Sequence, residues 1–417
     1  LPRDLVEVAA SLRLTAWQRF WKLDLPYAMP GLVWNMMMSM SGSWFFVVAS
    51  EALVVGQQQV MLPGIGSYLA VAIDARDLGA VGWVVLTMLV VIILYDQVLF
   101  RPLVAWSEKF NLQVTAGVGG SGSWLLTLGE RARLIQTLLV RPAGRLLSHV
   151  AQLPLGPRLR WQAEAPASTP GWPDRLWLAG LTALALWALW SVWHYLAQAV
   201  DFHDVLAVFG LGALTLLRVA VLIVLASLVW VPVGVWIGLR PQLAGRVQAM
   251  AQFLAAFPAN LLFPACVVLI IHFRLDPNVW LSPLLIFGTQ WYILFNVVAG
   301  AQAFPAEYRE VASNLQIRGG LWWRKVMLPG IFPYFLTGAL TASGGAWNAS
   351  IVGEYVSWGN DVLVARGLGS YIAEHTASGQ HPQVLLGILV MAVYVVLFNR
   401  LLWRPFQELA ERRLSLA

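Results

Sequence analysis

Two polar segments of the sequence carry residues suited to binding another protein rather than to catalysis. Residues 7–12 read Glu-Val-Ala-Ala-Ser-Leu, and residues 310–315 read Glu-Val-Ala-Ser-Asn-Leu. In each segment the valine and the leucine stand four residues apart, so they would share one face of a short helix. The glutamate is expected in the first turn of that helix, where the dipole favours negative charge. An apolar pair on a polar helix is typical of docking into a partner's groove.

Other side chains that could do chemistry are sparse. His375 and His381 lie six residues apart, which is not a usual metal-ligand spacing, and Cys266 is the only cysteine. No Ser/His/Asp grouping, paired carboxylates or phosphate-binding Gly-x4-Gly-Lys-Ser/Thr loop occurs in the sequence. We therefore expect no catalytic residue, no metal and no cofactor in this chain.

The composition predicts an all-α, polytopic transmembrane helical bundle. Of 417 residues, 59% are hydrophobic and only 12% are charged, about half the charge of a soluble domain. Apolar runs near 20 residues can cross a bilayer, and in lipid they must be helices because every backbone group needs an internal partner. Eight such runs occur, at about 32–55, 81–101, 176–198, 212–238, 249–273, 279–301, 332–355 and 383–403.

The basic residues predict an orientation rather than nucleic-acid binding, although the net charge is +6. With residues 1–30 placed in the cytoplasm, the outer loops contain only Arg76, Arg274 and Arg366, and Arg218 lies in or beside a span. The remaining basic residues then lie inside, as the positive-inside rule requires. We expect a multi-pass protein of a prokaryotic cell (inner) membrane, with the lipid bilayer as a partner and no nucleic acid.

The sequence also repeats itself at an offset of 303 residues, from about Asp4 to Lys109. Glutamate, tryptophan, proline and tyrosine recur in register, which apolar bias alone does not produce. The matches include Glu7 with Glu310, Trp44 with Trp347, Glu51 with Glu354, Gly66-Ser67-Tyr68 with Gly369-Ser370-Tyr371, and Arg101-Pro102 with Arg404-Pro405. Six spans separate the copies, so both face the same side and the repeats are parallel.

This repeat predicts three regions. Residues 1–112 would be the later part of the first copy, a polar loop with two spans, and residues 175–417 the second copy with six. We expect the first copy to be truncated at its N-terminal end. Residues 113–174, rich in Gly, Ser, Arg and Pro, predict a cytoplasmic linker. It is either a plain tether or carries an amphipathic stretch near 124–140 that lies on anionic headgroups.

The two polar segments resemble the EAA loop of binding-protein-dependent ABC transporter permeases. That loop has Glu-Ala-Ala, then a glycine, and later Leu-Pro; the glutamate, the second small residue and Leu-Pro match in both copies. Val8 and Val311 replace the first alanine, and Arg13 and Gln316 occupy the glycine position. The residues to which the resemblance assigns ATPase coupling are Glu7, Val8, Ala9, Leu12, Leu25, Pro26, Glu310, Val311, Ala312, Leu315, Leu328 and Pro329.

The duplicated form is similar to the permease component of the nitrate, sulfonate and taurine importers. The resemblance implies a type I ABC importer fold, two ABC ATPase subunits that bind the ATP, and an extracytoplasmic solute-binding protein. The chain itself would then be a transport subunit and not an enzyme. The substrate would be a small solute, expected to be an anion such as nitrate, a sulfonate or taurine.

Several other polar or aromatic residues are candidates for the transport path. They either line it or serve helix packing, anchoring or headgroup contact. The path candidates are Ser43, Trp44, Arg218, Gln290, Asn296, Trp347 and Asn348. Glu51 and Glu354 fall near the outer interface, about 25 residues after Leu-Pro at about 1.5 Å per residue, and are candidates for an outer gate.

Two other function classes are open to a chain of this composition. An ATP-independent secondary transporter or channel would need no docking segments, and the parallel repeat disfavours it because many secondary transporters have inverted repeats. A membrane-embedded enzyme lacks a cluster of catalytic residues.

Overall fold

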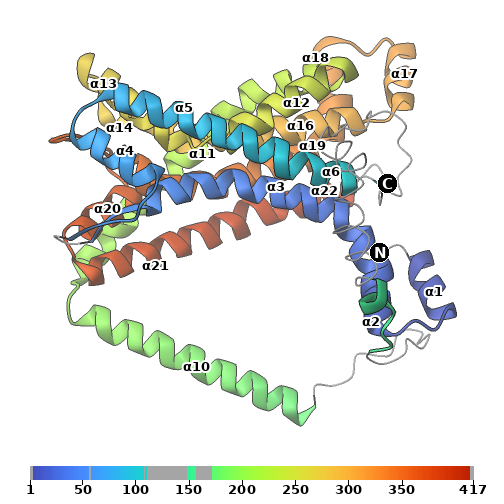
Figure 1. Ribbon diagram of the computed structural model, residues 1–417, viewed down its shortest axis with the longest axis horizontal. Coiled ribbons are helices and arrows are strands. Elements are labelled where there is room, and N and C mark those ends of the chain that lie inside the picture. The colour runs from blue at the N-terminus through green and yellow to red at the C-terminus, as the bar shows by residue number, and fades with distance from the viewer. Residues whose placement is uncertain (1–2, 56–57, 108, 110–147, 156–170, 414–417) are drawn as a thin grey trace, which may run out of the picture. The chain divides into compact units, whose positions relative to one another are not determined.

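The computed structural model describes residues 3–413, apart from 56–57, 108, 110–147 and 156–170. Helices dominate this part of the chain (Figure 1). Contacts divide the chain into two compact units, Leu1–Ser39 with Ile93–Val192, and Met40–Ile92 with Trp193–Ala417. The helices α3 (Leu25–Ser50), α5 (Leu78–Tyr95) and α10 (Trp172–Ala197) each run from one unit into the other.

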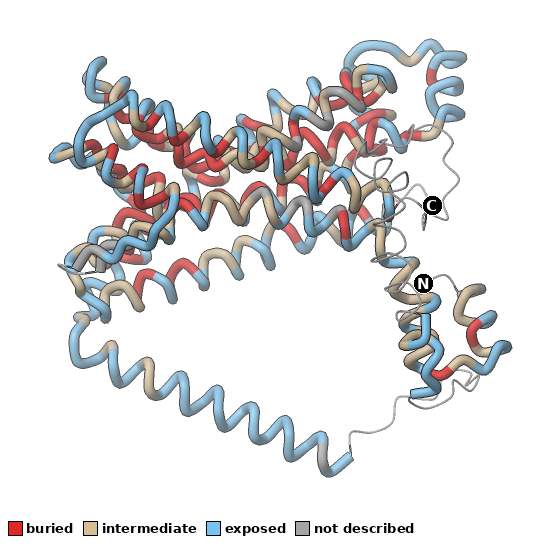
Figure 2. The backbone as a smooth tube through the Cα atoms, viewed as in Figure 1, coloured by how far each residue is buried: buried red, intermediate tan, exposed pale blue. Residues whose placement is uncertain are grey.

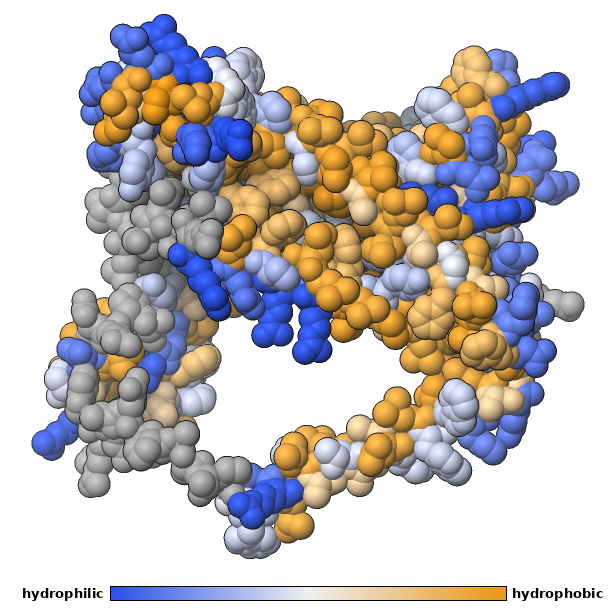
Figure 3. All heavy atoms as spheres, turned by 180° about the vertical axis from the view of Figure 1, so that it is seen from behind, coloured by the Kyte–Doolittle hydropathy of each residue, from blue (hydrophilic) through white to orange (hydrophobic). Residues whose placement is uncertain are grey.

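Long apolar helices confirm the all-α, polytopic membrane architecture. Among the described residues, five stretches are long and apolar enough to cross a membrane: Leu78–Ser107, Asp174–Ala197, Phe202–Gly238, Gly319–Gly353 and His381–Arg412. Pro277–Phe287 and Trp291–Ala303, bent by 46° at a short break, would together form a sixth. Apolar residues cover these helices, and polar residues gather near their ends (Figure 3).

The first unit is built around short helices at the start of the chain. It holds α1 (Arg3–Ser11), α2 (Ala16–Arg19), the π-helices η1 (Phe20–Asp24) and η2 (Asp96–Phe100), and α6 (Arg101–Ser107). Residues 148–155 bind to α2: Trp17 Nε1 donates to Val150 O at 2.7 Å, and Gln18 Nε2 to Gln152 O at 3.0 Å. Residues 148–155 belong to the expected linker, residues 113–174. The stretch 124–140, for which an amphipathic helix was one alternative, lies outside the described residues.

The helix α10 is exposed along almost its whole length (Figure 2). It is apolar, and its most hydrophobic 18-residue window contains no buried residue. An apolar helix that is exposed in this way suits contact with lipid or with another membrane helix.

The second unit is a layered bundle in which α16 packs against both α11 and α19 (Figure 1). In chain order its later elements are α11 (Phe202–Gly238), α12 (Pro241–Ala256), η5 (Ala259–Leu262), α13 (Phe263–His272), α14 (Pro277–Trp280), α15 (Ser282–Phe287), α16 (Trp291–Ala303), α17 (Ala306–Asn314), α18 (Gly319–Trp322), η6 (Trp323–Met327), α19 (Leu328–Gly353), β3 (Tyr355–Trp358), β4 (Asp361–Val364), α20 (Leu368–Ala377), α21 (His381–Phe398), η7 (Asn399–Trp403) and α22 (Arg404–Arg413). From the first copy it includes β1 (Ala52–Val55), β2 (Gln58–Met61) and α4 (Ile65–Asp74).

The elements of the two copies correspond one to one at the 303-residue offset. From Arg3 to Phe100, each element has a counterpart with the same bounds 303 residues later, α1 with α17 and α3 with α19 among them. The hairpins share their register as well: Ala52 pairs with Met61, and Tyr355 pairs with Val364. The same local sequence pattern therefore folds in the same way twice.

One expected span is not a single helix. The run 249–273 breaks after Ala256, because Phe257 is extended with ψ 126° and Pro258 cannot donate a helical hydrogen bond. A 3₁₀ turn and the separate helix α13 follow. The expected run 32–55 also ends early, since α3 stops at Ser50 and β1 begins at Ala52.

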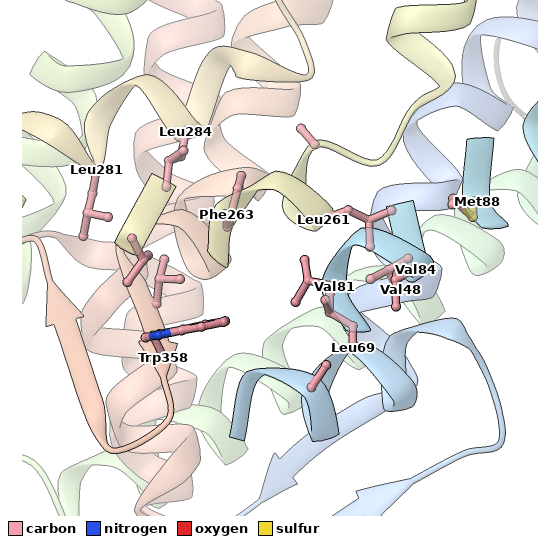
Figure 4. Packing of buried hydrophobic residues seen from close by; sticks show 14 of the residues in the cluster. Val48, Leu69, Val81, Val84, Met88, Leu261, Phe263, Leu281, Leu284 and Trp358 are labelled. Atoms are coloured by element: carbon pink, nitrogen blue, oxygen red, sulfur yellow. The ribbon is translucent and has the colours of Figure 1, made fainter. Parts of the chain in front are cut away.

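A buried cluster in the second unit joins residues of both copies (Figure 4). The first copy contributes Val48, Leu69, Val81, Val84 and Met88, and the second contributes Leu261, Phe263, Leu281, Leu284 and Trp358. A hydrogen bond crosses the same contact, from Asn260 Nδ2 to Phe45 O at 3.1 Å. The two copies therefore share one core at this seam, defined as the contact between residues 42–92 and 255–365.

Candidate functional site

The paired helices α1 and α17 present the apolar pairs that the sequence predicts. Val8, Leu12, Val311 and Leu315 are each more than half exposed. The alanine between them is buried in both helices, Ala9 at 1% exposure and Ala312 at 3%. Each helix thus buries its small residue and leaves its apolar pair uncovered, which suits a groove on a partner.

Both helices end in the same way. Arg13 has φ +49° and Gln316 has φ +51°, in the left-handed region that glycine favours. Leu14 N donates to Ala9 O at 3.1 Å and Ile317 N to Ala312 O at 2.9 Å, which closes each turn. The glycine position of the EAA pattern therefore keeps the glycine-like conformation in both copies, although neither copy has a glycine there.

The expectation that the glutamates lie in the first helical turn is wrong. The helix α17 begins at Ala306, directly after Pro305, so Glu310 is its fifth residue. Glu7 has the same place in α1, and both side chains are exposed. Pro305 is the N-cap residue, and its extended ψ of 139° keeps it outside the helix, so the first turn begins only at Ala306. The residue Glu307, not Glu310, is the first-turn acid of α17.

The Leu-Pro pairs mark the start of the long helices. Leu25-Pro26 opens α3 and Leu328-Pro329 opens α19, each after a five-residue π-helix. In the second copy the helix runs without a break from Gly319 through the π-helix into α19, so Pro329 lies within a longer helix. The π-helical segment stands directly before the proline, which lacks an N–H for the helical hydrogen bond.

A buried carboxylate lies at the other end of α19. Glu354 is fully buried, and Arg218 donates to it from α11. Thr215 Oγ1 donates to Glu354 Oε1 at 3.0 Å, and the backbone N–H groups of Gly369 and Ser370 donate to Oε2 at 2.8 and 3.2 Å. A carboxylate without water needs this many donors. Glu354 thus caps the N-terminus of α20 and ties it to α11.

Glu51 repeats the capping arrangement in the first copy. Its Oε2 accepts from Gly66 N, the counterpart of Gly369, at 2.5 Å. Gly64 and Gly367 precede the capped helices, and a Cβ at either would overlap the carboxylate beside it. Glu51 and Glu354, the two outer-gate candidates, therefore each cap the N-terminus of the helix that follows them. A role of either residue in an outer gate stays a prediction.

Arg218 is held on several sides. Besides Glu354, it donates through Nη2 to Arg366 O at 3.2 Å. Asn278 Oδ1 accepts from Arg366 N at 2.8 Å, which connects α14 to the same network. The sequence marks Arg218 and Glu354 for different roles, and the fold brings them together.

The remaining path candidates lie along the helices near the seam. Ser43 and Trp44 are half-buried in α3, and Asn348 is exposed on α19. Trp347 is buried against Tyr394, with ring centroids 6.3 Å apart, and its indole N–H has no partner among the described residues. Two candidates stay paired within the unit: Gln290 Oε1 accepts from Trp230 Nε1 at 2.9 Å, and Asn296 Nδ2 donates to Tyr292 O at 2.8 Å.

Two hollows lie at the seam between the copies. One of about 70 Å³ is lined by residues such as Gly42, Phe45, Thr289 and Gly345. The other, about 240 Å³, is more open and is lined by both hairpin bases and by Asn260. The buried hydroxyl of Thr289 and the Oδ1 of Asn260 have no partner among the described residues. The sequence analysis does not name Thr289 or Asn260. The polar break Gly288-Thr289-Gln290 within an apolar run was the signal that could have pointed to Thr289.

The described residues hold no cluster of three or more His, Cys, Asp or Glu side chains that could bind a metal ion. On α20, burial raises the pKa of Tyr371 to about 12, and the nearby charge of Asp204 adds to this rise. Its ring lies 4.1 Å from that of His375. The phenol is therefore a neutral packing and hydrogen-bonding group at physiological pH.

The chain matches the family of binding-protein-dependent transport system inner membrane components over residues 1–101 and 230–415. It belongs to this family. The match covers both copies, each with its exposed helix pair and capping glutamate, so the resemblance seen in the sequence is confirmed. As a family member the chain is a multi-pass transport permease component.

Relatives of this permease include two kinds of anion permease. A bicarbonate transport system permease protein of Synechococcus elongatus is 29% identical over 187 residues, 45% of this chain and 64% of the relative. A nitrate import permease protein of Leptolyngbya laminosa is 28% identical over 189 residues, again 45% and 64%. The chain thus spans a little under two thirds of the length of these curated relatives.

Proposed function

We propose that this permease is the membrane-spanning subunit of an ATP-binding-cassette importer for a small anion in a prokaryotic inner membrane. Two ABC ATPase subunits bind and hydrolyse the ATP, and an extracytoplasmic solute-binding protein delivers the anion. The permease itself carries out no chemical reaction.

The observation that carries the proposal is the matched pair α1 and α17. Two helices 303 residues apart leave the same apolar pair exposed, bury the same alanine and end in the same left-handed turn. Two copies of one docking helix predict two copies of one partner, as an ATPase dimer would supply. A transporter that needs no motor has no use for such a pair.

The anion assignment rests on the relatives and on the seam. The named relatives transport bicarbonate and nitrate. Both ions are small and planar, and the two hollows at the seam are of a size for small solutes. Thr289 lines the smaller hollow and Asn260 the larger one, and each has a buried side-chain oxygen without a partner among the described residues.

The test is a double variant of α17, Val311→Asp with Leu315→Asp, in the chain expressed together with the ATPase and solute-binding subunits that the proposal requires. Labelled bicarbonate and nitrate uptake are measured in cells, and bound ATPase subunit is measured after purification. Charging two interface anchors is expected to lower uptake by about tenfold or more and to release the ATPase, since each anchor contributes about 1–2 kcal/mol or more.

The matched control is Ser313→Asp, which adds a charge to the exposed face of the same helix outside the apolar pair. It should leave uptake and ATPase retention within about twofold of the wild type. Normal uptake and normal ATPase retention in the double variant would contradict the coupling role. Retained coupling with no uptake of either ion would contradict only the anion assignment.

A further inference from the structure

Residues 148–155, within the expected linker, bind to the loop that follows α1, and we call them the strap. Residues 148–152 of the strap are helical. The last carbonyls of a helix have no partner inside it. Leu153 N donates back to Val150 O at 3.3 Å, and Pro154 has no N–H to donate. The end of the strap therefore presents carbonyl oxygens that can accept from another segment.

Two adjacent residues of α2 supply the donors. Trp17 Nε1 donates to Val150 O at 2.7 Å, and Gln18 Nε2 donates to Gln152 O at 3.0 Å. The backbone contributes as well, because Trp17 N donates to Leu155 O at 3.4 Å. This N–H belongs to the first turn of α2 and has no acceptor inside the helix. The strap and α2 thus pair each other's open helix ends.

The start of α2 is also closed from within and lies close to α1. Gln18 N donates to Thr15 Oγ1, and Thr15 N donates to Gln18 Oε1, which together form a capping box. Gln18 therefore joins the cap and the strap through one side chain. The helix α1 ends at Ser11, and Leu14 N donates to Ala9 O at 3.1 Å across the short turn that follows. Because this turn is short and closed, a constraint on α2 also limits the orientation of α1.

Neither feature recurs in the described residues of the second copy. Gly320 and Leu321 stand 303 residues after Trp17 and Gln18, so no indole or amide donor is present there. The N-cap of α18 is Arg318, whose side chain forms no capping hydrogen bond. The helices α1 and α17 therefore match in their exposed pairs but differ in how the loop behind each of them is held.

We propose that the strap positions the first docking helix, α1, for its ATPase subunit, whereas α17 has no such support. Trp17 and Gln18 are positioning residues that act through α2. The inference rests on the proposed function, since it takes α1 and α17 as the two docking helices. A helix held in its bound orientation loses less conformational freedom on binding. A lid over α1 does not fit, because Val8 and Leu12 are 51% and 66% exposed with the strap in place.

The test breaks the strap contacts and keeps the cap of α2. Trp17→Phe removes the indole N–H but keeps an aromatic ring beside Trp21. Gln18→Glu keeps an oxygen for Thr15 N and places a carboxylate, which cannot donate, beside Gln152 O. The two changes are combined in the full chain. The matched control is Gln152→Ala, which removes an exposed side chain of the strap and keeps the carbonyl that Gln18 contacts.

Hydrogen exchange of the purified chain measures how firmly the loop is held. Exchange within residues 13–24 should rise about tenfold in the double variant, as for the loss of two hydrogen bonds. Exchange within residues 316–327 should stay within about twofold, and Gln152→Ala should match the wild type in both segments. If size exclusion shows that the double variant is not folded, Trp17→Phe alone is measured, with an expected rise of about threefold.

Photo-crosslinking measures docking at each helix separately, in the chain expressed with the ATPase and solute-binding subunits. A photoreactive residue replaces Ser11 on α1 or Asn314, its match on α17, and both positions are exposed. Breaking the strap should lower the yield of ATPase crosslinks from position 11 about threefold or more. The yield from position 314 should stay within about twofold.

Three results would overturn the positioning role and leave the proposed function standing. They are unchanged exchange in a folded strap variant, an unchanged crosslink yield from position 11, and a higher yield, which would make the strap a lid. Absence of ATPase crosslinks from both positions in the wild type would contradict the proposed function itself, and the positioning role with it.

Discussion

The two helix-end glutamates occupy the same place in the two copies but differ in their surroundings. Glu354 is fully buried and has an arginine, a threonine and two backbone N–H groups as donors. Glu51 is half-buried and accepts from Gly66 N, and no arginine or lysine pairs with it among the described residues. The capping motif is therefore local, whereas the cation is needed only where water is absent.

The largest effect that this comparison predicts is for removal of the buried carboxylate. Glu354→Ala strands Arg218 in a dry site and should lower the unfolding free energy by about 3–5 kcal/mol. Glu51→Ala removes one cap in a half-exposed site and should cost about 1 kcal/mol. Thermal unfolding in detergent, followed by size exclusion, compares the two variants. Equal losses would mean that the cation at Glu354 contributes nothing beyond the cap.

A smaller effect is expected when the charge of Arg218 is kept but its geometry is lost. Arg218→Lys retains a cation for Glu354 but cannot also reach the carbonyls of Arg366 and Asn278. We expect a loss of about 1–3 kcal/mol, mostly from the carbonyls left unpaired. A Lys variant as unstable as Glu354→Ala would show that charge alone does not satisfy this site.

The glycines under the caps should behave alike in the two copies. A Cβ at Gly66 would overlap Val48 O, and one at Gly369 would overlap Ser350 O. Either substitution to alanine should cost about 1–3 kcal/mol, since the obstacle is backbone that cannot rotate away. Gly344→Ala on α19, where a Cβ meets nothing within 4 Å, is the control and should be neutral or stabilising. A large difference between Gly66→Ala and Gly369→Ala would mean that the two caps are not packed alike.

The sequence predicts the parts of this protein that are local, and it fails where distant segments meet. The repeat, the exposed pairs of α1 and α17 and the correspondence of Glu51 with Glu354 follow from residue types at fixed spacings. The contact of Arg218 with Glu354 joins residues 136 positions apart, so only the packing of α11 reveals it. The unpaired indole of Trp347 is likewise invisible in the sequence, because it depends on which side chains surround it.

The break at Phe257–Pro258 also involves a contact between distant segments. The apolar run around it satisfies the length rule for a span, and proline within an apolar run is compatible with a membrane helix. Pro258 interrupts the helical hydrogen bonds, and after it Asn260 and Leu261 pack against the first copy, where Asn260 bonds to Phe45 O. The proline and a tertiary contact together therefore outweigh the tendency of this run to form one helix.

The smallest predicted effect concerns the turns after α1 and α17. Arg13 and Gln316 hold left-handed φ values that cost a non-glycine residue about 1–2 kcal/mol, whereas glycine adds an unfolded-state entropy of about 0.5–1 kcal/mol. Arg13→Gly and Gln316→Gly should each stabilise the protein by about 0.5 kcal/mol. Arg318→Gly is the control: its φ is −132°, so the substitution relieves no strain and should destabilise by a similar amount.

Because unfolding shifts this small are hard to resolve in detergent, protease cleavage within residues 306–318 gives the sharper measurement. Slower cleavage in Gln316→Gly and faster cleavage in Arg318→Gly would show that the turn itself was strained. Slower cleavage in both would mean that flexibility, and not the left-handed conformation, controls the end of α17.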